Sequence, residues 1–192
     1  IASFETGGFV MDSGRKTDGK AFSAMPPPIV FRHDFPADWC FVIVIPGMEK
    51  GLFGRTEDEV MSCLNPSKKI SEEICRLTHM KLLPALIEKN IYDFGESLTE
   101  IDLKTGMFFE KAQGGLYQGG ELAHEIVESF LQNGAYGAGQ SSWGPAIYGL
   151  TDKDNAQILA TRMEGFLVQK NTKGKVLISL ADNHGANIIV EV

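Results

Sequence analysis

Cysteine, histidine, positive charge and long apolar runs are all scarce in this chain of 192 residues. Its three cysteines form no Cys-x-x-Cys pair, so neither a disulfide framework nor a zinc site is expected. The four histidines, His33, His79, His124 and His184, lack the spacing of metal ligands. No apolar stretch reaches the roughly 18 residues that a membrane-spanning helix needs. These absences disfavour a disulfide-rich secreted scaffold, a zinc protein and a membrane-spanning protein.

Acidic residues outnumber basic ones by 25 to 18, which gives a formal net charge of −7. Proteins that wrap nucleic acid usually carry a basic excess, so nucleic acid is not an expected partner. A few donors can still bind an anionic small molecule inside an acidic protein. No signal peptide is visible and the cysteines suit a reducing compartment, which indicates the cytoplasm. The opening residues read as the middle of a fold, so we expect residues before Ile1.

Apolar periodicity predicts both helices and strands along the chain. Helices are expected at 71–90, 93–109, 121–133 and 154–167, and strands at 1–11, 39–45, 146–150, 175–180 and 186–192. Pro84 should kink or split the first of these helices. Residues 181–185 have the composition of a hairpin turn, and the glycine- and proline-rich stretch 12–28 that of a loop or boundary. This order of elements predicts an α+β fold with helices on one face of a mainly antiparallel sheet.

The most distinctive segment runs from Gly137 to Pro145 and reads Gly-Ala-Gly-Gln-Ser-Ser-Trp-Gly-Pro. Its glycines allow the backbone to approach a ligand closely and to point N–H groups at it. The amide and the two hydroxyls are donors suited to phosphate or carboxylate oxygens, and the indole offers a flat apolar face. Glycine-rich loops also serve as simple tight turns, so from chemistry alone both interpretations of residues 139–145 stay open.

Several runs, taken in order, resemble one enzyme family. They are Phe4-Glu5-x-Gly-Gly-Phe9-Val10-x-Asp12, Pro27-Pro28-Ile29-Val30-Phe31-Arg32, Leu83-Pro84-Ala85-Leu86-Ile87-Glu88, Phe94-Gly95, Gln113-Gly114-Gly115 and the Gly-Gln-Ser-Ser-Trp-Gly-Pro run with Tyr148-Gly149 after it. Together they are similar to the β-ribofuranosylaminobenzene 5'-phosphate synthases, along nearly the whole chain. That family is related in fold to the GHMP kinases.

The resemblance implies a GHMP-kinase-like protein whose C-terminal domain is ferredoxin-like. It assigns residues 1–28 to the end of an N-terminal GHMP-type domain with its linker, and residues 29–192 to the C-terminal domain. The glycine-serine phosphate loop of that N-terminal domain is expected before residue 1, so residues 1–192 alone are expected to be inactive. The loop at 139–145 takes the place of the kinases' third, glycine-rich motif, and its Gln-Ser-Ser-Trp indicates altered chemistry.

The resemblance also implies a reaction. The family condenses phosphoribosyl pyrophosphate with a 4-substituted benzoate, 4-aminobenzoate or 4-hydroxybenzoate, with loss of pyrophosphate and carbon dioxide, in tetrahydromethanopterin biosynthesis. The pyrophosphate implies Mg²⁺, whose ligands are not assigned, and no organic cofactor is expected. The expected partners are these small molecules, with neither nucleic acid nor membrane, and a homodimer is the candidate assembly.

Candidate site residues follow from residue type and from the resemblance. Catalytic candidates are Gln140, Ser141, Ser142, Asp12 and Glu5, and substrate-binding candidates are Gly139, Trp143, Gly144, Arg32, Gln113, Gly114 and Gly115. The serines and Gln140 suit phosphate or carboxylate, Trp143 suits stacking on a ring, and the acidic residues suit the ribosyl centre or Mg²⁺. Two alternatives stay open, an ATP-dependent small-molecule kinase of the GHMP type and a non-catalytic ferredoxin-like binding module.

Overall fold

The computed structural model describes residues 2–14, 27–47 and 67–187. These residues fall into two compact units, one built from residues 1–37 and 180–192 and the other from residues 38–179. The two units divide after residues 37 and 179, and the assignment of residues 1–28 to an N-terminal domain remains a prediction. No helix within the described ranges is long and apolar enough to cross a membrane.

The smaller unit contains α1 (Ala2–Thr6), β1 (Phe9–Asp12) and β2 (Ile29–His33), and the two strands pair antiparallel. The prediction of one strand over residues 1–11 is therefore wrong. Gly7 and Gly8 both have positive φ, so they turn the chain between α1 and β1 rather than forming a bulge. A strand over residues 186–192 is not formed at 186 and 187, and the rest of that range lies outside the described residues.

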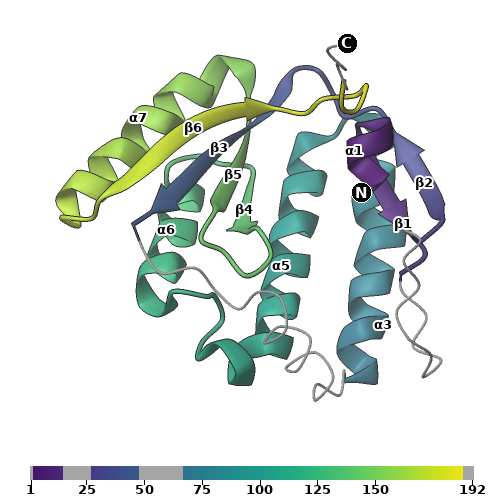
Figure 1. The fold of residues 1–192 in the computed structure, drawn as a ribbon, viewed down its shortest axis with the longest axis horizontal. Coiled ribbons are helices and arrows are strands. Elements are labelled where there is room, and N and C mark those ends of the chain that lie inside the picture. Colours follow the sequence, from purple (N-terminus) through teal and green to yellow (C-terminus); the bar gives the residue numbers. More distant parts are fainter. Residues whose placement is uncertain (1, 15–26, 48–66, 188–192) are drawn as a thin grey trace, which may run out of the picture. The chain divides into compact units, whose positions relative to one another are not determined.

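The larger unit holds a four-stranded sheet in the order β4-β5-β3-β6 (Figure 1). The strands are β3 (Trp39–Pro46), β4 (Gly137–Gln140), β5 (Ile147–Asp152) and β6 (Gly174–Leu180). β3 and β4 each run antiparallel to β5, which confirms a mainly antiparallel sheet; it contains residues 39–45, 175–180 and 147–150 of the predicted strand 146–150. The apolar run of β3 forms a strand because its alternate residues are buried in the core.

Helices cover the sheet and its edge (Figure 1). They are α3 (Lys68–Leu77), the π-helical turn η1 (Thr78–Leu82), α4 (Leu83–Glu88), α5 (Ile91–Gln113), α6 (Gly120–Gln132) and α7 (Lys153–Gln169). The predicted interruption at Pro84 is confirmed, since Pro84 lies in the first turn of α4, directly after the π-helical turn. Asn90 caps α5 and Asp152 caps α7, each accepting from a backbone N–H three residues later.

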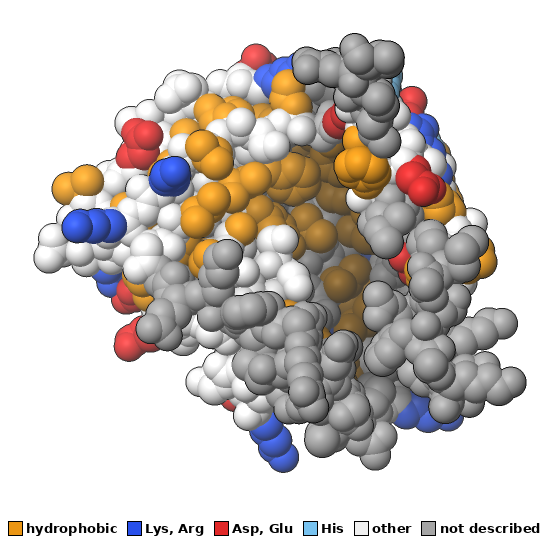
Figure 2. All heavy atoms as spheres, viewed as in Figure 1, with side chains coloured by type: hydrophobic (Ala, Val, Ile, Leu, Met, Phe, Trp, Pro, Cys, Tyr) orange, Lys and Arg blue, Asp and Glu red, His pale blue; other side chains and the backbone are white. Residues whose placement is uncertain are grey.

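The hydrophobic core lies between the sheet and the two helices α6 and α7. Val42 and Val44 of β3 pack there with Ile126 and Phe130 of α6 and with Met163 of α7. Gly149 of β5 leaves the room that the Phe130 ring occupies, because a Cβ at Gly149 would lie 2.3 Å from that ring. In the view of Figure 2, hydrophobic side chains gather around a hollow near the centre of the face.

β4 corrects the prediction of a loop over residues 139–145. Gly139 and Gln140 belong to the strand, and the turn begins only at Ser141. The glycines of β4 fit a strand here because α5 approaches it very closely: a Cβ at Gly137 would lie 2.2 Å from the carbonyl oxygen of Gly95. The glycines therefore serve strand–helix packing as well as the turn that follows.

Candidate functional site

A cavity of about 370 Å³ lies in the larger unit, between α5, the segment after it, β5 and the turn that follows β4. Four aromatic side chains contribute to its wall, namely Phe109, Tyr117, Trp143 and Tyr148. Polar groups reach it from Asp102, Thr105, Gln113, Gln140 and Ser142. The described wall residues include no Lys, Arg or His. Such a mixture of rings and a few polar groups is typical of a pocket for a flat organic molecule.

α5 contributes one long stripe to the cavity. Leu98, Asp102, Thr105, Phe109 and Gln113 follow each other at spacings of three and four residues, so they share one helix face. The segment after α5 folds back close to this face, because Gly106 has no side chain. A Cβ there would lie 2.3 Å from the carbonyl oxygen of Leu116.

α5 also provides hydrogen-bond acceptors for the edge of β4 that does not pair with β5. The N–H of Ala138 donates to Oγ1 of Thr99 (2.8 Å), and the N–H of Gln140 donates to Oδ2 of Asp102 (3.2 Å). These two N–H groups point away from β5, so without α5 they would lack a partner in the sheet. Asp102 is thereby held against the end of the strand from which the candidate loop begins.

Asp102 sits in an unusual electrostatic setting. Burial raises the pKa of its carboxyl to about 6, although hydrogen bonds from the Gln140 N–H and the Tyr117 hydroxyl oppose the shift. Burial and the nearby Asp102 also raise the pKa values of Tyr117 and Tyr148, so both phenols stay protonated. Gly139 makes this grouping fit: a Cβ there would lie 2.5 Å from Cγ of Asp102 and 2.6 Å from the Tyr148 hydroxyl oxygen.

Gln140 is the most tightly held of the predicted site residues. Only 6% of it is exposed, its Oε1 accepts from the Gln118 N–H (2.8 Å) and its Nε2 donates to the Gln118 carbonyl oxygen (2.8 Å). Gln113 similarly donates to the carbonyl oxygen of Leu116 (2.7 Å). Both amides therefore hold the segment after α5 in place beside the cavity.

The turn after β4 presents the remaining candidates. The Ser141 N–H donates to Ala146 (2.8 Å) and the Gly144 N–H to Ser141 (3.1 Å), which closes the turn. Ser141 and Ser142 are exposed, and Ser142 has a left-handed backbone with φ 53°. Trp143 is only 8% exposed and meets Phe109 edge-on at 5.1 Å between ring centroids. An exposed serine thus stands next to the buried Trp143, which packs against the partly buried Phe109 in the cavity wall.

Gly114 and Gly115 follow the C-terminal end of α5. Gly114 has φ 76° and its N–H donates to the carbonyl oxygen of Glu110 (2.9 Å), a common way for a helix to end. A side chain at Gly114 would meet open space. The structure thus gives Gly114 a capping role, and ligand binding by Gly114 and Gly115 remains a prediction.

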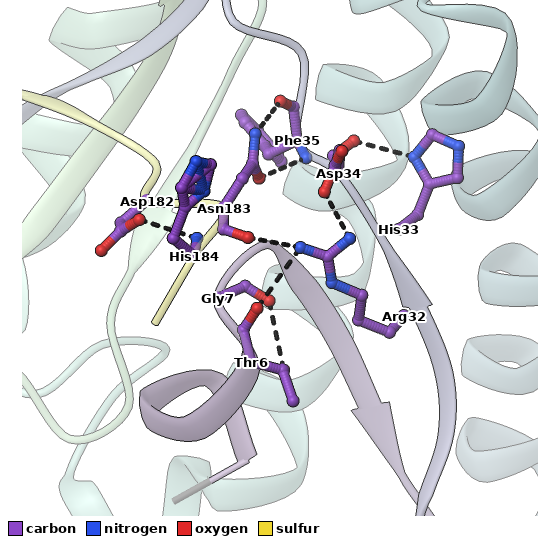
Figure 3. A network of polar contacts seen from close by, with 9 residues as sticks. All are labelled: Thr6, Gly7, Arg32, His33, Asp34, Phe35, Asp182, Asn183 and His184. Carbon is purple, nitrogen blue, oxygen red and sulfur yellow. Dashed lines mark hydrogen bonds and ion pairs between the residues drawn. The ribbon is translucent and has the colours of Figure 1, made fainter. Parts of the chain in front are cut away.

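Three candidates, Glu5, Asp12 and Arg32, belong to the smaller unit. Arg32 forms an ion pair with Asp34 and donates to the carbonyl oxygens of Asn183 (2.5 Å) and Thr6 (3.3 Å), as Figure 3 shows. Oδ1 of Asp12 accepts from the Gly14 N–H (2.8 Å), and Glu5 is exposed on α1. Their predicted roles in catalysis and binding remain predictions.

Comparison with known proteins places this arrangement in context. A family model described as GHMP kinases C terminal matches residues 82–169. The β-ribofuranosylphenol 5'-phosphate synthase of Methanothermobacter thermautotrophicus is 34% identical over 98% of this chain and 57% of its own length. The synthase of that name from Archaeoglobus fulgidus is 34% identical over 99% of this chain and 59% of its own.

This chain is a homologue of the C-terminal part of these synthases, and its residues 82–169 match the GHMP kinase C-terminal family. It spans between 57% and 59% of the length of the curated relatives that it matches. Homoserine kinase from Cytophaga hutchinsonii shares its fold, with a TM-score of 0.67 and 21% identity over 96% of this chain and 52% of that one. Mevalonate diphosphate decarboxylase from Enterococcus faecalis does so with a TM-score of 0.58 and 14% identity over 93% and 53%.

Asp102 lines the cavity but was not among the residues that the sequence predicted for the site. In the sequence, the apolar residues of the helix at 93–109 lie at helical spacing, which indicates core packing; they are Phe94, Leu98, Ile101 and Met107. Phe94 is buried, but Met107 is 49% exposed, so the packed face is rotated from the expected one. A signal was present, because a carboxylate lies four residues after Leu98 and seven before Phe109, on one helical face.

The described part of this chain contains no group of three or more His, Cys, Asp or Glu side chains arranged to hold a metal ion. Mg²⁺ is often held by one or two carboxylates together with substrate phosphates, so it does not need such a group. The described residues therefore supply no complete Mg²⁺ cage.

Proposed function

We propose that this chain is the C-terminal part of a synthase that condenses phosphoribosyl pyrophosphate with 4-hydroxybenzoate, releasing pyrophosphate and carbon dioxide, in cytoplasmic tetrahydromethanopterin biosynthesis. The choice of benzoate follows from the relatives, whose name describes a ribofuranosylphenol phosphate. A phenol product keeps the hydroxyl of 4-hydroxybenzoate, whereas 4-aminobenzoate would give an aminobenzene.

One observation carries this proposal: the aligned chain holds a cavity walled by aromatic rings. A dry cavity of about 150 Å³ already admits benzene. The cavity beside Trp143 and Phe109, at about 370 Å³, has room for a benzoate ring and for part of the ribosyl group. Since the described wall residues carry no cationic side chain, the cavity suits the ring better than a pyrophosphate.

The turn after β4 supplies the donors of the proposed site. Ser141 and Ser142 are exposed, so their hydroxyls are available to the benzoate carboxylate or to a phosphate oxygen. Trp143 and Phe109 hold the ring, and Gln140 acts by fixing the segment that carries Tyr117. Placing a flat acid in one orientation beside the ribosyl carbon removes much of the entropic cost of the reaction.

The ribosyl and pyrophosphate groups need partners outside this cavity. Glu5, Asp12 and Arg32 stay candidates for them, together with the N-terminal part that the relatives contain. Mg²⁺ is proposed to arrive on phosphoribosyl pyrophosphate, where it neutralises the departing pyrophosphate. No residue of the chain is assigned to it.

The proposal is tested in a protein in which this chain follows the N-terminal part present in its relatives, called the extended protein below. Carbon dioxide release from carboxyl-labelled 4-hydroxybenzoate is measured with and without phosphoribosyl pyrophosphate. Release that depends on both substrates, with one pyrophosphate formed for each carbon dioxide, supports the proposal.

The two alternatives give different outcomes in that experiment. A GHMP-type kinase would consume ATP with a small alcohol and would release no carbon dioxide from the labelled acid. A non-catalytic binding module would do neither while still binding a ligand. Either outcome would contradict the proposed condensation.

A further inference from the structure

Asp102 is the acidic side chain among the described residues of the cavity wall, and the others are neutral. The titratable groups that face it are Tyr117, from the segment before α6, and Tyr148, from β5. The Gln140 N–H and the Tyr117 hydroxyl use about two of the roughly four lone-pair positions of a carboxylate. Asp102 therefore has acceptor capacity left for a ligand inside the cavity that it lines.

Charge fixes the orientation of a 4-hydroxybenzoate in this cavity. An ionised Asp102 repels the benzoate carboxylate and attracts the hydroxyl at the opposite end of the ring. The described wall offers no Lys, Arg or His that would compensate a buried carboxylate. The hydroxyl consequently points toward Asp102, and the carboxylate points toward the exposed serines of the turn after β4.

We propose that Asp102 is a catalytic residue that accepts the proton of the substrate's 4-hydroxyl group. The inference rests on the proposed function and deepens it, because the carbon that bears the carboxylate is para to this hydroxyl. A phenoxide donates electron density to its para carbon, so removing the proton makes that carbon the nucleophile. A base at the hydroxyl end of the substrate ring thus promotes bond formation at the opposite carbon.

The electrons and atoms balance without a further reactant. The phenolic proton passes to the Asp102 carboxylate, and the para carbon forms a bond to the ribosyl C1 as the bond from that C1 to pyrophosphate breaks. The ring carbon then loses carbon dioxide, and the pair from that bond restores the aromatic ring. Asp102 returns the proton to the phenoxide, so the product is a phenol and the carboxylate is regenerated.

The surroundings of Asp102 suit this task. A general base works best when its pKa lies near the working pH, and burial brings the pKa of Asp102 to about 6. Tyr117 and Tyr148 have raised pKa values, so they remain protonated and do not compete for the substrate's proton. Gly139 keeps the carboxylate and the Tyr148 hydroxyl beside the strand.

The test compares wild type, Asp102→Asn and a control, Asp93→Asn, in the extended protein. Asp93 lies on the same helix α5 but outside the cavity wall, where it contacts Asn90 and Lys81. Removing a general base costs on the order of 10²–10⁴ in rate, so kcat with 4-hydroxybenzoate should fall by at least about 10² in Asp102→Asn. The control should keep the wild-type rate.

Substrate acidity separates a base from a structural role. A 3-fluoro-4-hydroxybenzoate has a more acidic hydroxyl, and a phenol ionises without help around pH 10. Asp102→Asn should therefore recover much of its rate with the fluorinated acid and at high pH, while wild type gains little. The rate of wild type should rise through about pH 6, and that of the variant should not.

Each outcome decides the inference. An Asp102→Asn variant with unchanged kcat and pH profile overturns it. Equal losses of kcat with both acids at every pH also overturn it, because they indicate a positioning role. A melting temperature and a Trp fluorescence spectrum like those of wild type show that the variant is folded. If wild type itself releases no carbon dioxide, the proposed function has failed, which is a separate result.

Discussion

The polar network of the smaller unit and the cavity of the larger unit use charged side chains in opposite ways. Arg32 is paired with Asp34 and with two backbone carbonyl groups, and Asn183 exchanges two hydrogen bonds with the backbone of Phe35 (2.8 and 3.0 Å) (Figure 3). Asp102 instead lines an open cavity and has a raised pKa. The partners of Arg32 therefore indicate a structural role, whereas the position of Asp102 leaves it available to a ligand.

The largest expected effect concerns the chain on its own. Residues 1–192 should not turn over phosphoribosyl pyrophosphate, because the relatives contain much more chain and one part of a site cannot preorganise the transition state. Carbon dioxide release by the chain alone and by the extended protein checks this. Turnover by residues 1–192 would show that the cavity and the smaller unit already make a full active site.

Gly139→Ala should damage the cavity, because the new side chain would meet Asp102 and Tyr148. The new Cβ would lie 2.5 Å from Cγ of Asp102, so the Asp102 and Tyr148 side chains, or the elements that carry them, must shift, at a cost of about 1–3 kcal/mol. We expect at least a hundredfold loss of rate in the extended protein, on the order of the effect of a lost catalytic group. Gly165→Ala in α7 is the matched control, because a side chain there meets open space; it should keep the wild-type rate and hold or raise the melting temperature, since Ala favours a helix over Gly.

Trp143 tests whether the rings of the cavity bind the substrate. Trp143→Phe keeps an aromatic side chain beside Phe109 but loses area, so binding of 4-hydroxybenzoate should weaken by about tenfold while the protein stays folded. Calorimetric titration of the extended protein measures the affinity.

Ser141→Ala and Ser142→Ala should lower kcat with little effect on the melting temperature, since both side chains are exposed. If both serine variants keep the wild-type kcat, the turn has only a structural role.

Arg32→Ala tests whether the charged residue of the smaller unit has a structural role. It removes an ion pair and two hydrogen bonds, so the smaller unit should lose about 1–3 kcal/mol of stability. Binding of 4-hydroxybenzoate should be unaffected. Arg162→Ala, which loses one hydrogen bond to Asn133, is the control. A large rise in the KM for phosphoribosyl pyrophosphate without loss of stability would instead make Arg32 a ligand-binding residue.

The smallest effect is the pH dependence of stability. Burial raises the pKa of Asp102 from 3.8 to about 6, so the folded chain retains this proton longer than the unfolded chain does. The stability contribution is therefore full below the unfolded pKa and is lost as pH rises through about 6. Wild type should lose stability relative to Asp102→Asn over this range, as denaturant titrations would show. If the difference in stability between wild type and Asp102→Asn does not change with pH, the Asp102 carboxyl is solvated rather than buried.

Sequence periodicity predicted the helices and three strands of the larger unit because their apolar faces pack on one core. It was wrong about residues 1–11, where paired glycines with positive φ separate a helix from a strand. It was also wrong about Gly139 and Gln140, because the fit of a glycine-rich strand against α5 depends on tertiary contacts such as that of Gly137 with Gly95.

Several predicted site residues that lie close together in the sequence also line the same cavity, while their roles remain predictions. Gln140, Ser142 and Trp143 do line one cavity, and Gln113 joins them from the end of α5. Asp102 was missed because a helix stripe does not reveal whether it faces a core or a cavity. That depends on how the segment at Leu116 folds back over Gly106, which the sequence pattern does not encode locally.

The most direct test is a crystal structure of the extended protein with 4-hydroxybenzoate bound. The account predicts that the ring lies beside Phe109 and Trp143, with its hydroxyl oxygen within hydrogen-bond distance of the Asp102 carboxylate and its carboxylate toward Ser141 and Ser142. An acid bound outside this cavity, or bound with its carboxylate toward Asp102, would contradict it.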